Sequence, residues 1–563
     1  MIRIGASLDR TDKILLLFLT GLTALLALPY VRPSLLPYED NLMLFRYAQN
    51  LAQGHGIVWN VGGTPVDGGT DFLLLVLLAG LNKVGIPLIV ASRSVNLISQ
   101  ILTVDIVYIA VRSLLKSARS LALTSAAFVI AGPGVWYIAA CFGTPFFALL
   151  VALTWYFALK IRDEAHPNVT ALGFSLTALV MGLTRPEGVF LSLFMVGSIL
   201  YWRGFKGSKE ILLRFFLVFI TLGGAYFLWH WRYFGYPLPN PYYRKGGGHL
   251  YWGSLLQSVK NVALLTWPVC MVFMLGFRKA KTARVALFSL IPILGFTTIW
   301  ILLSNEMNVW RRFQYPVLLL VLMVWPALLE GISGDLKLPK FEDLHWPVRA
   351  GLLGTLCLFL LSVLAFNEHE YGKEFGSESQ RHDGRHDLAL ELRQFKGNNY
   401  TMAVSEAGHL PFDSGWRSID AVGLNDAWVA HHNGQIAESY LAESKPELIM
   451  FHAPFSPLVP PTQGTSVTQP WLQMTLTLNK FAVEHGYCLA AALSDTPYEA
   501  HYYYVRPDFP DSGKIVEIIR HTPYIWLYTG RLSMNWAMQE PSTGPGGNLS
   551  PQPQQTLTNG GCS

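Results

Sequence analysis

Charged side chains are scarce in this chain of 563 residues, where Asp, Glu, Lys and Arg make up 14% of the sequence. Soluble domains carry about 25%. Hydrophobic residues make up 51%, and the mean hydropathy is +0.33. This composition excludes a purely cytosolic enzyme and a disordered scaffold. The 42 Lys and Arg and 37 Asp and Glu nearly balance, so the basic excess of a nucleic-acid binder is missing as well. The composition favours a polytopic membrane protein.

Cysteine is also scarce, with five residues and no CxxC or HExxH metal pattern. Cys141, Cys270 and Cys357 lie in apolar runs, where thiols usually act as small core residues. Cys488 and Cys562 lie outside these runs, and the sequence leaves a bridge between them open. No small-residue cleavage site follows the first apolar run, so we expect an uncleaved N-terminal helix.

Apolar stretches long enough to cross a bilayer core of about 30 Å are abundant. They predict about eleven transmembrane helices, at residues 14–31, 94–113, 120–140, 143–160, 168–184, 187–202, 211–230, 254–277, 284–303, 314–331 and 347–366. The run at 71–90 is ambiguous. As a further span it would place Arg112, Lys116 and Arg119 outside, although cytoplasmic loops tend to carry Lys and Arg. We therefore interpret 71–90 as a juxtamembrane or re-entrant segment of a first outer loop at 32–93.

An odd number of spans with the N-terminus inside places the C-terminal part outside the membrane. From about Asn367 the composition becomes that of a soluble protein, and β-type runs such as 448–451 alternate with turn residues. We expect a transmembrane domain at 1–367 and a soluble α/β-type domain at 368–540. The tail at 541–563 is rich in Pro, Gly, Gln, Asn and Thr and is predicted to be disordered.

Two adjacent carboxylates, Glu39 and Asp40, precede a helical pattern at 41–53 that Gly54-His55-Gly56 ends. Paired like charges at a membrane interface are costly, which suggests a general base that takes a proton from an acceptor hydroxyl. The alternative is that Asp40 caps the helix while Glu39 faces water. The spacing gives the two interpretations about equal weight.

Basic residues recur in the other predicted outer loops. In the motif Arg185-Pro186-Glu187-Gly188, the guanidinium of Arg185 suits a lipid-linked phosphate. The alternative is that Pro186 and Glu187 start a helix and Arg185 reaches toward the lipid headgroups. This alternative is slightly favoured. The segment 231–245 has three prolines and an aromatic cluster and is predicted to be a rigid loop.

In that segment Arg232, Arg244 and Lys245 could neutralise a phosphate, whereas an aromatic interface belt is the alternative explanation of its Tyr and Phe residues. Glu306 with Arg311 and Arg312 could bind substrate or form an ion pair within the loop. Together these loops indicate an anionic lipid-linked substrate.

Several motifs follow one another in the order typical of a known superfamily. They are Glu39-Asp40 with FRYAQNLAQGHGIVWN, Val66-Asp67-Gly68-Gly69-Thr70, RPEG at 185–188, WRYFG at 231–235 with Pro239-Asn240 and Lys245, Arg312-Phe313, EAGHLP at 406–411, and Ile419-Asp420 with Gly423-Leu424-Asn425-Asp426. The sequence thereby resembles the GT-C superfamily of membrane glycosyltransferases, and most of all its bacterial arabinofuranosyltransferase branch. One departure is Cys141-Phe142-Gly143-Thr144-Pro145, because relatives often carry an acid before Thr-Pro.

The resemblance implies an inverting transferase of the bacterial inner membrane that uses a polyprenyl-phosphate sugar donor, such as polyprenyl-phosphate arabinofuranose, from the periplasmic side. Asp40 would be the base, with Glu39 as its neighbour or alternate. Further implied roles are donor-phosphate binding by Arg185, Arg232, Lys245 and Arg312, and substrate binding by His55, Asn240 and Glu306. The resemblance also leaves open a divalent metal (Mg²⁺, Mn²⁺ or Ca²⁺) at the carboxylates.

The resemblance allows two acceptors, cell-envelope arabinan or the Ser/Thr of a type IV pilin. The pilin is favoured because the chain lacks the Ala- and Arg-heavy composition common in high-GC actinobacterial proteins. A transporter or flippase of lipid-linked sugar is a weaker alternative, since transporters place ionisable groups near the membrane midplane. A third hypothesis is a membrane-anchored binding factor whose C-terminal domain is the active part.

Overall fold

The computed structural model describes residues 8–246, 248–278, 280–333, 345–372, 382–461, 469–527 and 529–538. Cys562 and the predicted disordered tail lie outside these residues. The chain divides into two compact units, and neither follows the predicted linear division. The first unit comprises Met1–Leu35, Thr70–Leu238 and Gly248–Gly372, and the second comprises Leu36–Gly69, Pro239–Gly247 and Lys373–Ser563.

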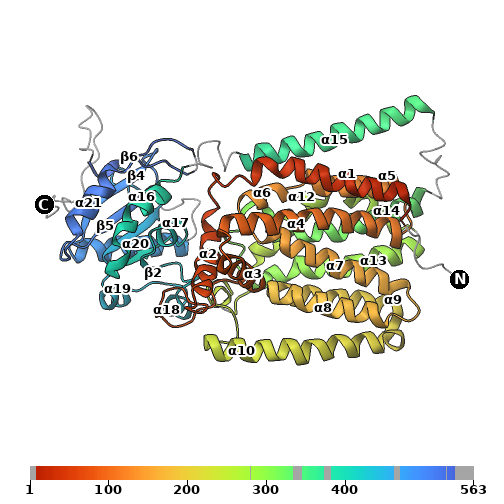
Figure 1. Cartoon of the computed structure of the whole chain (residues 1–563), viewed down its shortest axis with the longest axis horizontal. Coiled ribbons are helices and arrows are strands. Elements are labelled where there is room, and N and C mark those ends of the chain that lie inside the picture. Colours follow the sequence, from red (N-terminus) through yellow and green to blue (C-terminus); the bar gives the residue numbers. More distant parts are fainter. Residues whose placement is uncertain are drawn as a thin grey trace. The chain divides into compact units, whose positions relative to one another are not determined.

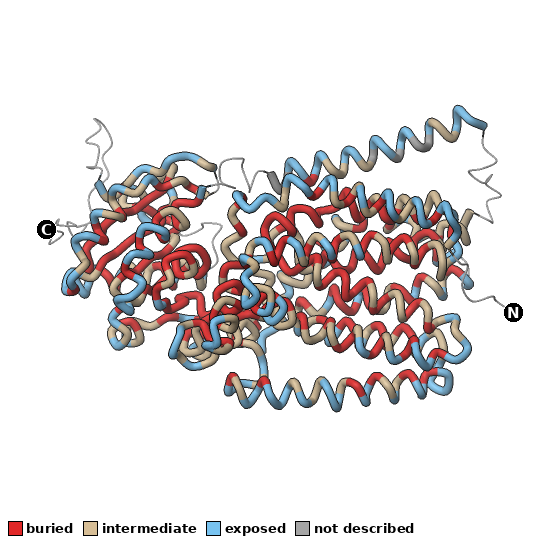
Figure 2. The backbone as a smooth tube through the Cα atoms, viewed as in Figure 1, coloured by how far each residue is buried: buried red, intermediate tan, exposed pale blue. Residues whose placement is uncertain are grey.

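The first unit is helical (Figure 1). Its helices are α1 (Arg10–Ala27), α3 (Phe72–Lys83), α4 (Leu88–Ile109), α5 (Arg119–Ala131), α6 (Gly134–Ala139), α7 (Thr144–Asp163), α8 (Asn168–Thr184), α9 (Glu187–Val218), α10 (Gly224–Phe234), α12 (Trp252–Gly276), α13 (Ala280–Thr298), α14 (Tyr315–Ser333) and α15 (Trp346–Gly372). Figure 2 shows that α7 is largely buried, whereas α10 and α15 are mostly exposed. At the centre Trp155 of α7 stacks on Phe288 of α13, with ring centroids 5.1 Å apart.

Six helical stretches of the described chain are long and apolar enough to cross a membrane, or seven if a bent pair within α12 counts as one span. They are Arg10–Tyr30, Leu88–Leu114, Thr144–Asp163, Glu187–Phe234, Ala280–Leu302 and Val309–Ser333. The predicted count of eleven differs partly in how the helices are counted. The stretch Glu187–Phe234 counts once although Gly204 (φ 69°) separates two helices in it, as the predicted spans at 187–202 and 211–230 expect. The predicted spans at 120–140 and 168–184 contain helices shorter than 18 residues, and α15 is not among the counted stretches.

The interpretation of 71–90 as a non-crossing segment agrees with the structure. Its helix α3 has 12 residues, about 18 Å at 1.5 Å per residue, which is too short for a bilayer core. Asp12, at the start of α1, forms ion pairs with Arg112 (3.1 Å) and Arg119 (3.0 Å), which follow α4. The start of α1 and the end of α4 therefore lie at the same end of the unit. Since α1 and α4 run in opposite directions, α3 between them does not add a crossing.

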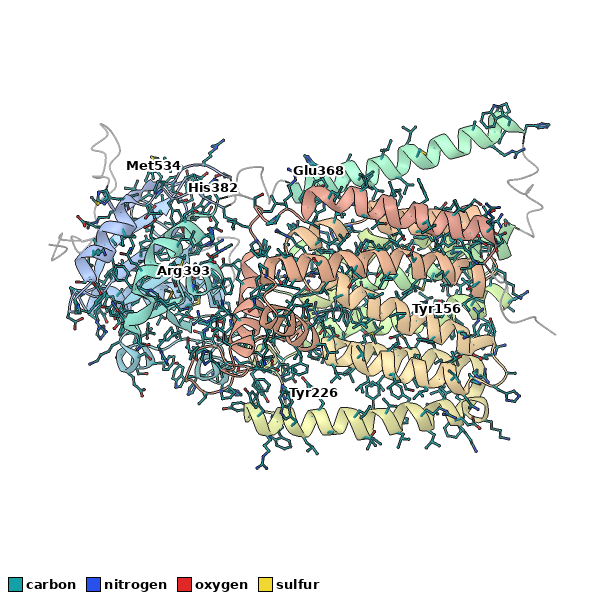
Figure 3. The ribbon with its side chains drawn as sticks, in the orientation of Figure 1. Tyr156, Tyr226, Glu368, His382, Arg393 and Met534 are labelled. Carbon is teal, nitrogen blue, oxygen red and sulfur yellow. The ribbon has the colours of Figure 1, made fainter. Side chains whose placement is uncertain are left out.

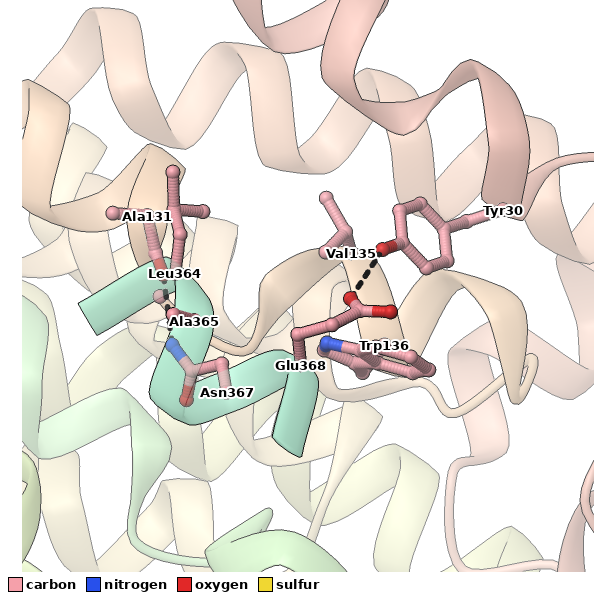
Figure 4. Close-up of a pocket in the computed structure, with 9 residues that line it drawn as sticks. Tyr30, Ala131, Val135, Trp136, Leu364, Ala365, Asn367 and Glu368 are labelled. Carbon is pink, nitrogen blue, oxygen red and sulfur yellow. Dashed lines mark hydrogen bonds between the residues drawn. The ribbon is translucent and has the colours of Figure 1, made fainter. Parts of the chain in front are cut away.

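The last helix of this unit extends beyond the predicted boundary near Asn367. Helix α15 continues to Gly372, because polar residues of its final turns bond within the unit. Asn367 donates from Nδ2 to the carbonyl of Ala131 (2.8 Å), and Tyr30 donates to Glu368 (3.0 Å). These side chains line a cavity of about 250 Å³ (Figure 4), and Glu368 is also labelled in Figure 3. The shift to polar composition thus begins inside a helix.

The second unit contains a mixed six-stranded sheet with strand order β2-β1-β3-β5-β4-β6. Its strands are β1 (Thr401–Val404), β2 (Arg417–Asp420), β3 (Leu448–Ala453), β4 (Cys488–Ser494), β5 (Ala500–Val505) and β6 (Met534–Asn535), and its helices are α2 (Glu39–Ala52), α11 (Asn240–Lys245), α16 (Gly384–Leu392), α17 (His409–Ser414), α18 (Ala427–His431), α19 (Glu438–Ser444), α20 (Gln469–Glu484) and α21 (Ser512–His521). Strand β1 runs parallel to β2 and β3, whereas β5 is antiparallel to β3 and β4. The β-type run predicted at 448–451 is the central strand β3.

Arg46 of α2 ties the segment Leu36–Gly69 to the C-terminal part of the second unit. Its guanidinium is buried and donates to the carbonyls of Trp59, Pro411 and Trp416, each at 2.7 Å, and to the side chain of Asn60 at 3.0 Å. These acceptors come from segments more than 350 residues apart in sequence. One buried side chain thus satisfies four acceptors in two parts of the unit.

Arg46→Met is expected to destabilise the second unit by about 3–5 kcal/mol, because buried carbonyls would lose their only charged donor. The measurement is thermal unfolding of the detergent-solubilised full chain, followed by tryptophan fluorescence. Arg417→Met is the matched control, since Arg417 is exposed and its Nη1 donates to Val61 (3.1 Å). Equal melting temperatures for the two variants would contradict the anchoring role of Arg46.

Candidate functional site

Arg185 lies in the first unit between α8 and α9. Pro186 caps α9 and Glu187 is its first residue, so the predicted helix start is confirmed. The Nε atom of Arg185 lies 2.8 Å from Glu187 Oε1 and 3.3 Å from Asp71 Oδ1. Because the side chain is 12% exposed, the guanidinium lies inside the unit and does not reach outward as the headgroup interpretation required.

The guanidinium of Arg185 keeps donors for a ligand. Both ion pairs approach its Nε atom, which carries only one of the five N–H donors of a guanidinium. The rings of Phe147 and Phe313 lie 5.6 and 5.3 Å from its Cζ atom. A guanidinium held at Nε between aromatic walls can bind a phosphate through its remaining N–H groups.

Arg312 lies beside the same aromatic ring. Its Cζ atom is 5.2 Å from the ring centroid of Phe313 and 4.0 Å from that of Phe142. Its Nη2 donates to the carbonyl of Met307 at 2.8 Å. The structure therefore brings together two of the predicted phosphate-binding residues, Arg185 and Arg312. We call Arg185, Asp71, Glu187, Arg312 and Phe313 the Arg185 cluster.

Asp71 is a member of the cluster that the sequence analysis missed. Its carboxylate lies against Gly143, so closely that a Cβ atom at Gly143 would collide with Asp71 Oδ2. Gly143 occupies the turn where relatives often carry an acid, and Asp71 brings a carboxylate to that turn from another segment. The available signal was the position of Asp71 directly after Thr70, at the end of the Val66–Thr70 motif.

The other predicted basic and polar residues lie outside the Arg185 cluster. Arg232 is exposed in the last turn of α10, and Glu306 is half-buried before Val309. His55, after α2, is exposed. Lys245 ends α11 and belongs to the second unit.

The prediction of a continuous loop at 231–245 was wrong at both ends. Residues 231–234 complete α10, which ends at Gly235 with φ 80°, and α11 begins at Asn240. Most aromatic residues of α10 are exposed, among them Phe227, Trp229 and Trp231. Tyr226, labelled in Figure 3, lies 4.9 Å from Phe72 and 5.8 Å from Trp229 between ring centroids.

Asn240 has a structural environment in the second unit. It is 4% exposed, and its Nδ2 donates to the carbonyls of Gly423 (2.8 Å) and Leu424 (3.1 Å). Its backbone N–H donates to Asp67 at 2.8 Å. Asn240 thus joins two of the resembling motifs, Val66–Thr70 and Gly423–Asp426.

Glu39 is engaged by backbone donors of the second unit. Its Oε1 accepts from the N–H of Gly408 (2.6 Å) and its Oε2 from that of His409 (3.1 Å). Arg385 lies 3.6 Å from Oε2. Gly408 must be glycine here, because a Cβ atom would collide with the Glu39 carbonyl. Glu39 therefore positions the start of α2 against the turn before α17.

Asp40 is the second residue of α2 and is half-buried. The helix begins at Glu39, and Tyr38 is the residue that caps it. The alternative in which Asp40 caps a helix starting at residue 41 was therefore wrong. Asp40 therefore lies in the first turn of α2, near the N–H groups at the start of that helix.

A buried ionic network, the Arg385 network, adjoins Glu39. Arg385 donates to Asp383 (2.6 Å) and contacts Glu406. Burial alone would raise the pKa of Glu406, yet the neighbouring guanidinium of Arg385 holds that pKa well below its ordinary value. Burial raises the pKa of Glu39. Removing Arg385 would leave several buried carboxylates without their shared cation.

A divalent metal at Glu39 and Asp40, which the resemblance left open, would have to share Glu39 with the partners that it already has. Both oxygens of Glu39 accept backbone N–H groups, and the nearest cation is the guanidinium of Arg385. A Mg²⁺ or Ca²⁺ ion requires carboxylate oxygens that are available as ligands. No step of the proposed reaction is therefore assigned to a metal at Glu39 and Asp40.

Asp420 provides a pH-dependent contribution to stability. It is 1% exposed, and its carboxylate accepts from the backbone of Val422 (3.0 Å) and from the backbone and side chain of Asn425 (2.8 and 2.9 Å). Burial outweighs these donors and raises the pKa of Asp420 to about 6. Since the folded-state pKa lies above the unfolded value of about 3.9, the contribution of Asp420 is fully present below pH 4 and is lost as the pH rises through 6.

We expect this loss to lower the free energy of unfolding by up to ~3 kcal/mol between pH 4 and 7, at about 1.4 kcal/mol per pKa unit. The measurement compares the pH dependence of thermal unfolding in the wild type and in Asp420→Asn. The difference between the two curves isolates the contribution of residue 420 from that of the other carboxylates. Parallel curves over pH 4 to 7 would contradict the raised pKa.

The fold of the chain is similar to that of solved structures of ArnT. ArnT from Cupriavidus metallidurans in the apo state aligns with a TM-score of 0.54 and 13% identity, covering 88% of this chain and 98% of ArnT. The structure of the same protein bound to undecaprenyl phosphate aligns with a TM-score of 0.53 and 12% identity, with the same coverage. The chain therefore shares its fold with ArnT, while the GT-C superfamily and its arabinofuranosyltransferase branch stay predictions.

Three further comparisons with known proteins say little about the fold or the function. Residues 374–510 match a family model described as a domain of unknown function, DUF8728. No curated protein matches the chain. The archaeal oligosaccharyltransferase AglB from Archaeoglobus fulgidus aligns at 12% identity over 89% of this chain and 75% of its own, with a TM-score of 0.49, too low to bear on the fold.

Proposed function

We propose that the chain is an inverting glycosyltransferase of the bacterial inner membrane. It moves arabinofuranose from a polyprenyl-phosphate donor to a Ser or Thr hydroxyl of a type IV pilin in the periplasm. The observation that carries the proposal is the buried Arg185, which forms ion pairs with Asp71 and Glu187 and lies with Arg312 beside the ring of Phe313. The fold of ArnT supports a lipid-phosphate ligand, because one ArnT structure holds undecaprenyl phosphate.

Asp40 is proposed as the general base. The acceptor oxygen attacks the anomeric carbon of the donor sugar, and its proton passes to the Asp40 carboxylate. The bond between the anomeric carbon and the phosphate oxygen breaks, and its electron pair leaves with the polyprenyl phosphate. Attack opposite the leaving group inverts the anomeric configuration. Glu39 is proposed to hold Asp40 in place through its bonds to Gly408 and His409.

Arg185 and Arg312 are proposed to bind the donor phosphate. The phosphate gains charge as the glycosidic bond breaks, and fixed cations stabilise a developing charge more effectively than water does. Asp71 and Glu187 restrain Arg185, so that less side-chain entropy is lost when the donor binds. Arg232 and Lys245 have weaker support as phosphate ligands, because Arg232 is exposed and Lys245 belongs to the other unit. Substrate roles for His55, Asn240 and Glu306 rest on the motif resemblance alone.

The test of sugar and acceptor uses the purified full chain with synthetic polyprenyl-phosphate arabinofuranose and either a pilin fragment or a short arabinan. Mass spectrometry of the acceptor should detect one added pentose on the pilin Ser or Thr. A pentose on arabinan alone would replace the pilin as acceptor. Transfer only from a hexose-linked donor would keep the reaction class and overturn the sugar.

A further inference from the structure

Two histidines lie directly opposite each other on neighbouring strands of the second unit. His452 of β3 pairs with His501 of β5 in the antiparallel register. Directly opposed residues present their side chains on the same face of a sheet, and the two imidazole centroids are 4.7 Å apart. Glu406 follows β1, the other neighbour of β3. Three potential metal ligands therefore come from rigid, adjacent parts of one sheet.

The outward nitrogen of each imidazole has its own partner. The Nε2 atom of His452 lies 3.0 Å from Glu499 Oε2, and the Nδ1 atom of His501 lies 2.5 Å from the Tyr524 hydroxyl. Because an ionised carboxylate only accepts, Glu499 fixes a proton on Nε2 of His452. The other nitrogen of each ring is then directed to Glu406. This is how metal-binding histidines are usually oriented by a second layer of contacts.

The separations between each inner imidazole nitrogen and the nearest oxygen of Glu406 favour a metal over direct hydrogen bonds. Nδ1 of His452 lies 3.4 Å from Glu406 Oε1, and Nε2 of His501 lies 3.5 Å from Oε2. Two ligands of a tetrahedral ion with bonds of about 2.0–2.1 Å are roughly 3.3–3.4 Å apart. Good N–H···O bonds have N to O distances of about 2.9 Å. The observed separations are closer to the first value.

The charges around these atoms also favour a cation. Glu406, Asp383 and Glu39 share the single guanidinium of Arg385, and Glu499 adds a further carboxylate beside His452. Four carboxylates thus adjoin one permanent cation. The aromatic ring of Trp526 lies 4.4 Å from His501 and 5.5 Å from His452, so that the histidines are shielded on one side by an apolar wall.

We propose that Glu406, His452 and His501 bind one divalent transition-metal ion of the zinc class, with its fourth position taken by water or a substrate group. Two imidazole nitrogens and one carboxylate oxygen are a donor set that suits Zn²⁺ and disfavours Mg²⁺ and Ca²⁺. All three ligands lie within the region that matches the domain of unknown function. None of the three ligands is assigned a role in the proposed transfer reaction.

A neighbouring group, His386, His409 and Asp413, has a different geometry. The Nδ1 atoms of both histidines lie 2.7 and 2.9 Å from the same Asp413 oxygen. These are hydrogen-bond distances, shorter than the separation of two ligands on one ion. We assign this group a structural role, and it provides a control cluster of the same chemistry in the same unit.

The test measures zinc bound to the detergent-solubilised full chain after removal of metal by a chelator. We expect about one Zn²⁺ per chain, measured by inductively coupled plasma mass spectrometry, and visible d–d absorption bands when Co²⁺ replaces it. His452→Asn and His501→Asn should abolish the bands. Glu499→Gln, which keeps all three ligands, should weaken zinc affinity by about 10–100-fold. Near-ultraviolet circular dichroism checks that each variant is folded.

His386→Asn is the matched control and should bind zinc as the wild type does. The proposal is overturned if the folded wild type binds no stoichiometric zinc, or if His452→Asn and His501→Asn retain it. Loss of zinc in His386→Asn with retention in His501→Asn would assign the ion to the control cluster. Sugar transfer is not the readout, so failure of the metal proposal and failure of the proposed function can be distinguished.

Discussion

Asp40→Asn is expected to lower the rate of sugar transfer by about 10²–10⁴-fold, because a positioned general base contributes on this order. Asparagine has nearly the same shape but cannot accept the proton of the acceptor hydroxyl. Asp40 lies in the first turn of α2 and is half-buried, so the substitution should leave the melting temperature nearly unchanged. The measurement is the initial rate of pentose transfer under saturating donor and acceptor.

Two variants make the Asp40 result interpretable. Asp508→Asn is the matched control, since Asp508 is exposed in the same unit and pairs with Arg506, and it should transfer at the wild-type rate. Glu39→Gln should lower stability, because both Glu39 oxygens accept backbone N–H groups. Full activity in Asp40→Asn combined with inactive but folded Glu39→Gln would assign the base to Glu39 instead.

Arg185→Lys is expected to reduce transfer by about 10²–10³-fold, similar to the loss of one preorganised donor to a developing negative charge. Lysine keeps the positive charge but lacks the planar guanidinium, whose several N–H groups can bind two carboxylates and a phosphate at the same time. Nε of Arg185 is already committed to Glu187 and Asp71, so a lysine ammonium would serve either the carboxylates or the phosphate. The measurement is transfer rate together with binding of the lipid-linked donor.

The control for Arg185 is Arg214→Lys on α9. Arg214 donates from Nη2 to Asn168 at 3.1 Å and has no proposed part in donor binding. We expect wild-type transfer and donor binding in this variant. If Arg185→Lys retained full transfer, or lost it through unfolding alone, the guanidinium would have no role in holding the donor phosphate.

The sequence predicted the helical class of the first unit because that class depends on local information. Apolar runs that cross a bilayer have a minimum length set by its thickness, and such runs can be read directly from the sequence. The non-crossing role of 71–90 followed from the basic residues around Arg112, and the ion pairs of Asp12 with Arg112 and Arg119 agree with it. The start of α9 at Glu187 followed from Pro186.

The errors arose where contacts between distant segments decide the structure. Composition placed a domain boundary near Asn367, but Asn367 and Glu368 bond to Ala131 and Tyr30 and so belong to α15. The assignment of residues 36–69 to the C-terminal unit depends on Arg46, whose acceptors Pro411 and Trp416 lie more than 360 residues away. No local pattern reports such a bond.

The candidate sites show the same limit. Arg185 and Arg312 were chosen from separate motifs, and their shared contact with Phe313 emerges only from the fold. Asp71 was missed because its carboxylate reaches the turn at Gly143 from a distant segment of the chain. His452 and His501 were missed because their pairing depends on the register of β3 with β5, and no short motif contains both residues.

The central claim is that the chain cleaves the bond between a sugar and polyprenyl phosphate and transfers the sugar. The most direct test reconstitutes the full chain in vesicles with synthetic polyprenyl-phosphate arabinofuranose and measures free polyprenyl phosphate by mass spectrometry, with and without the pilin fragment. The account predicts acceptor-dependent release of polyprenyl phosphate, equal in amount to the glycosylated pilin and lost in Asp40→Asn. Movement of intact donor between leaflets without release would contradict the enzyme and establish a transporter.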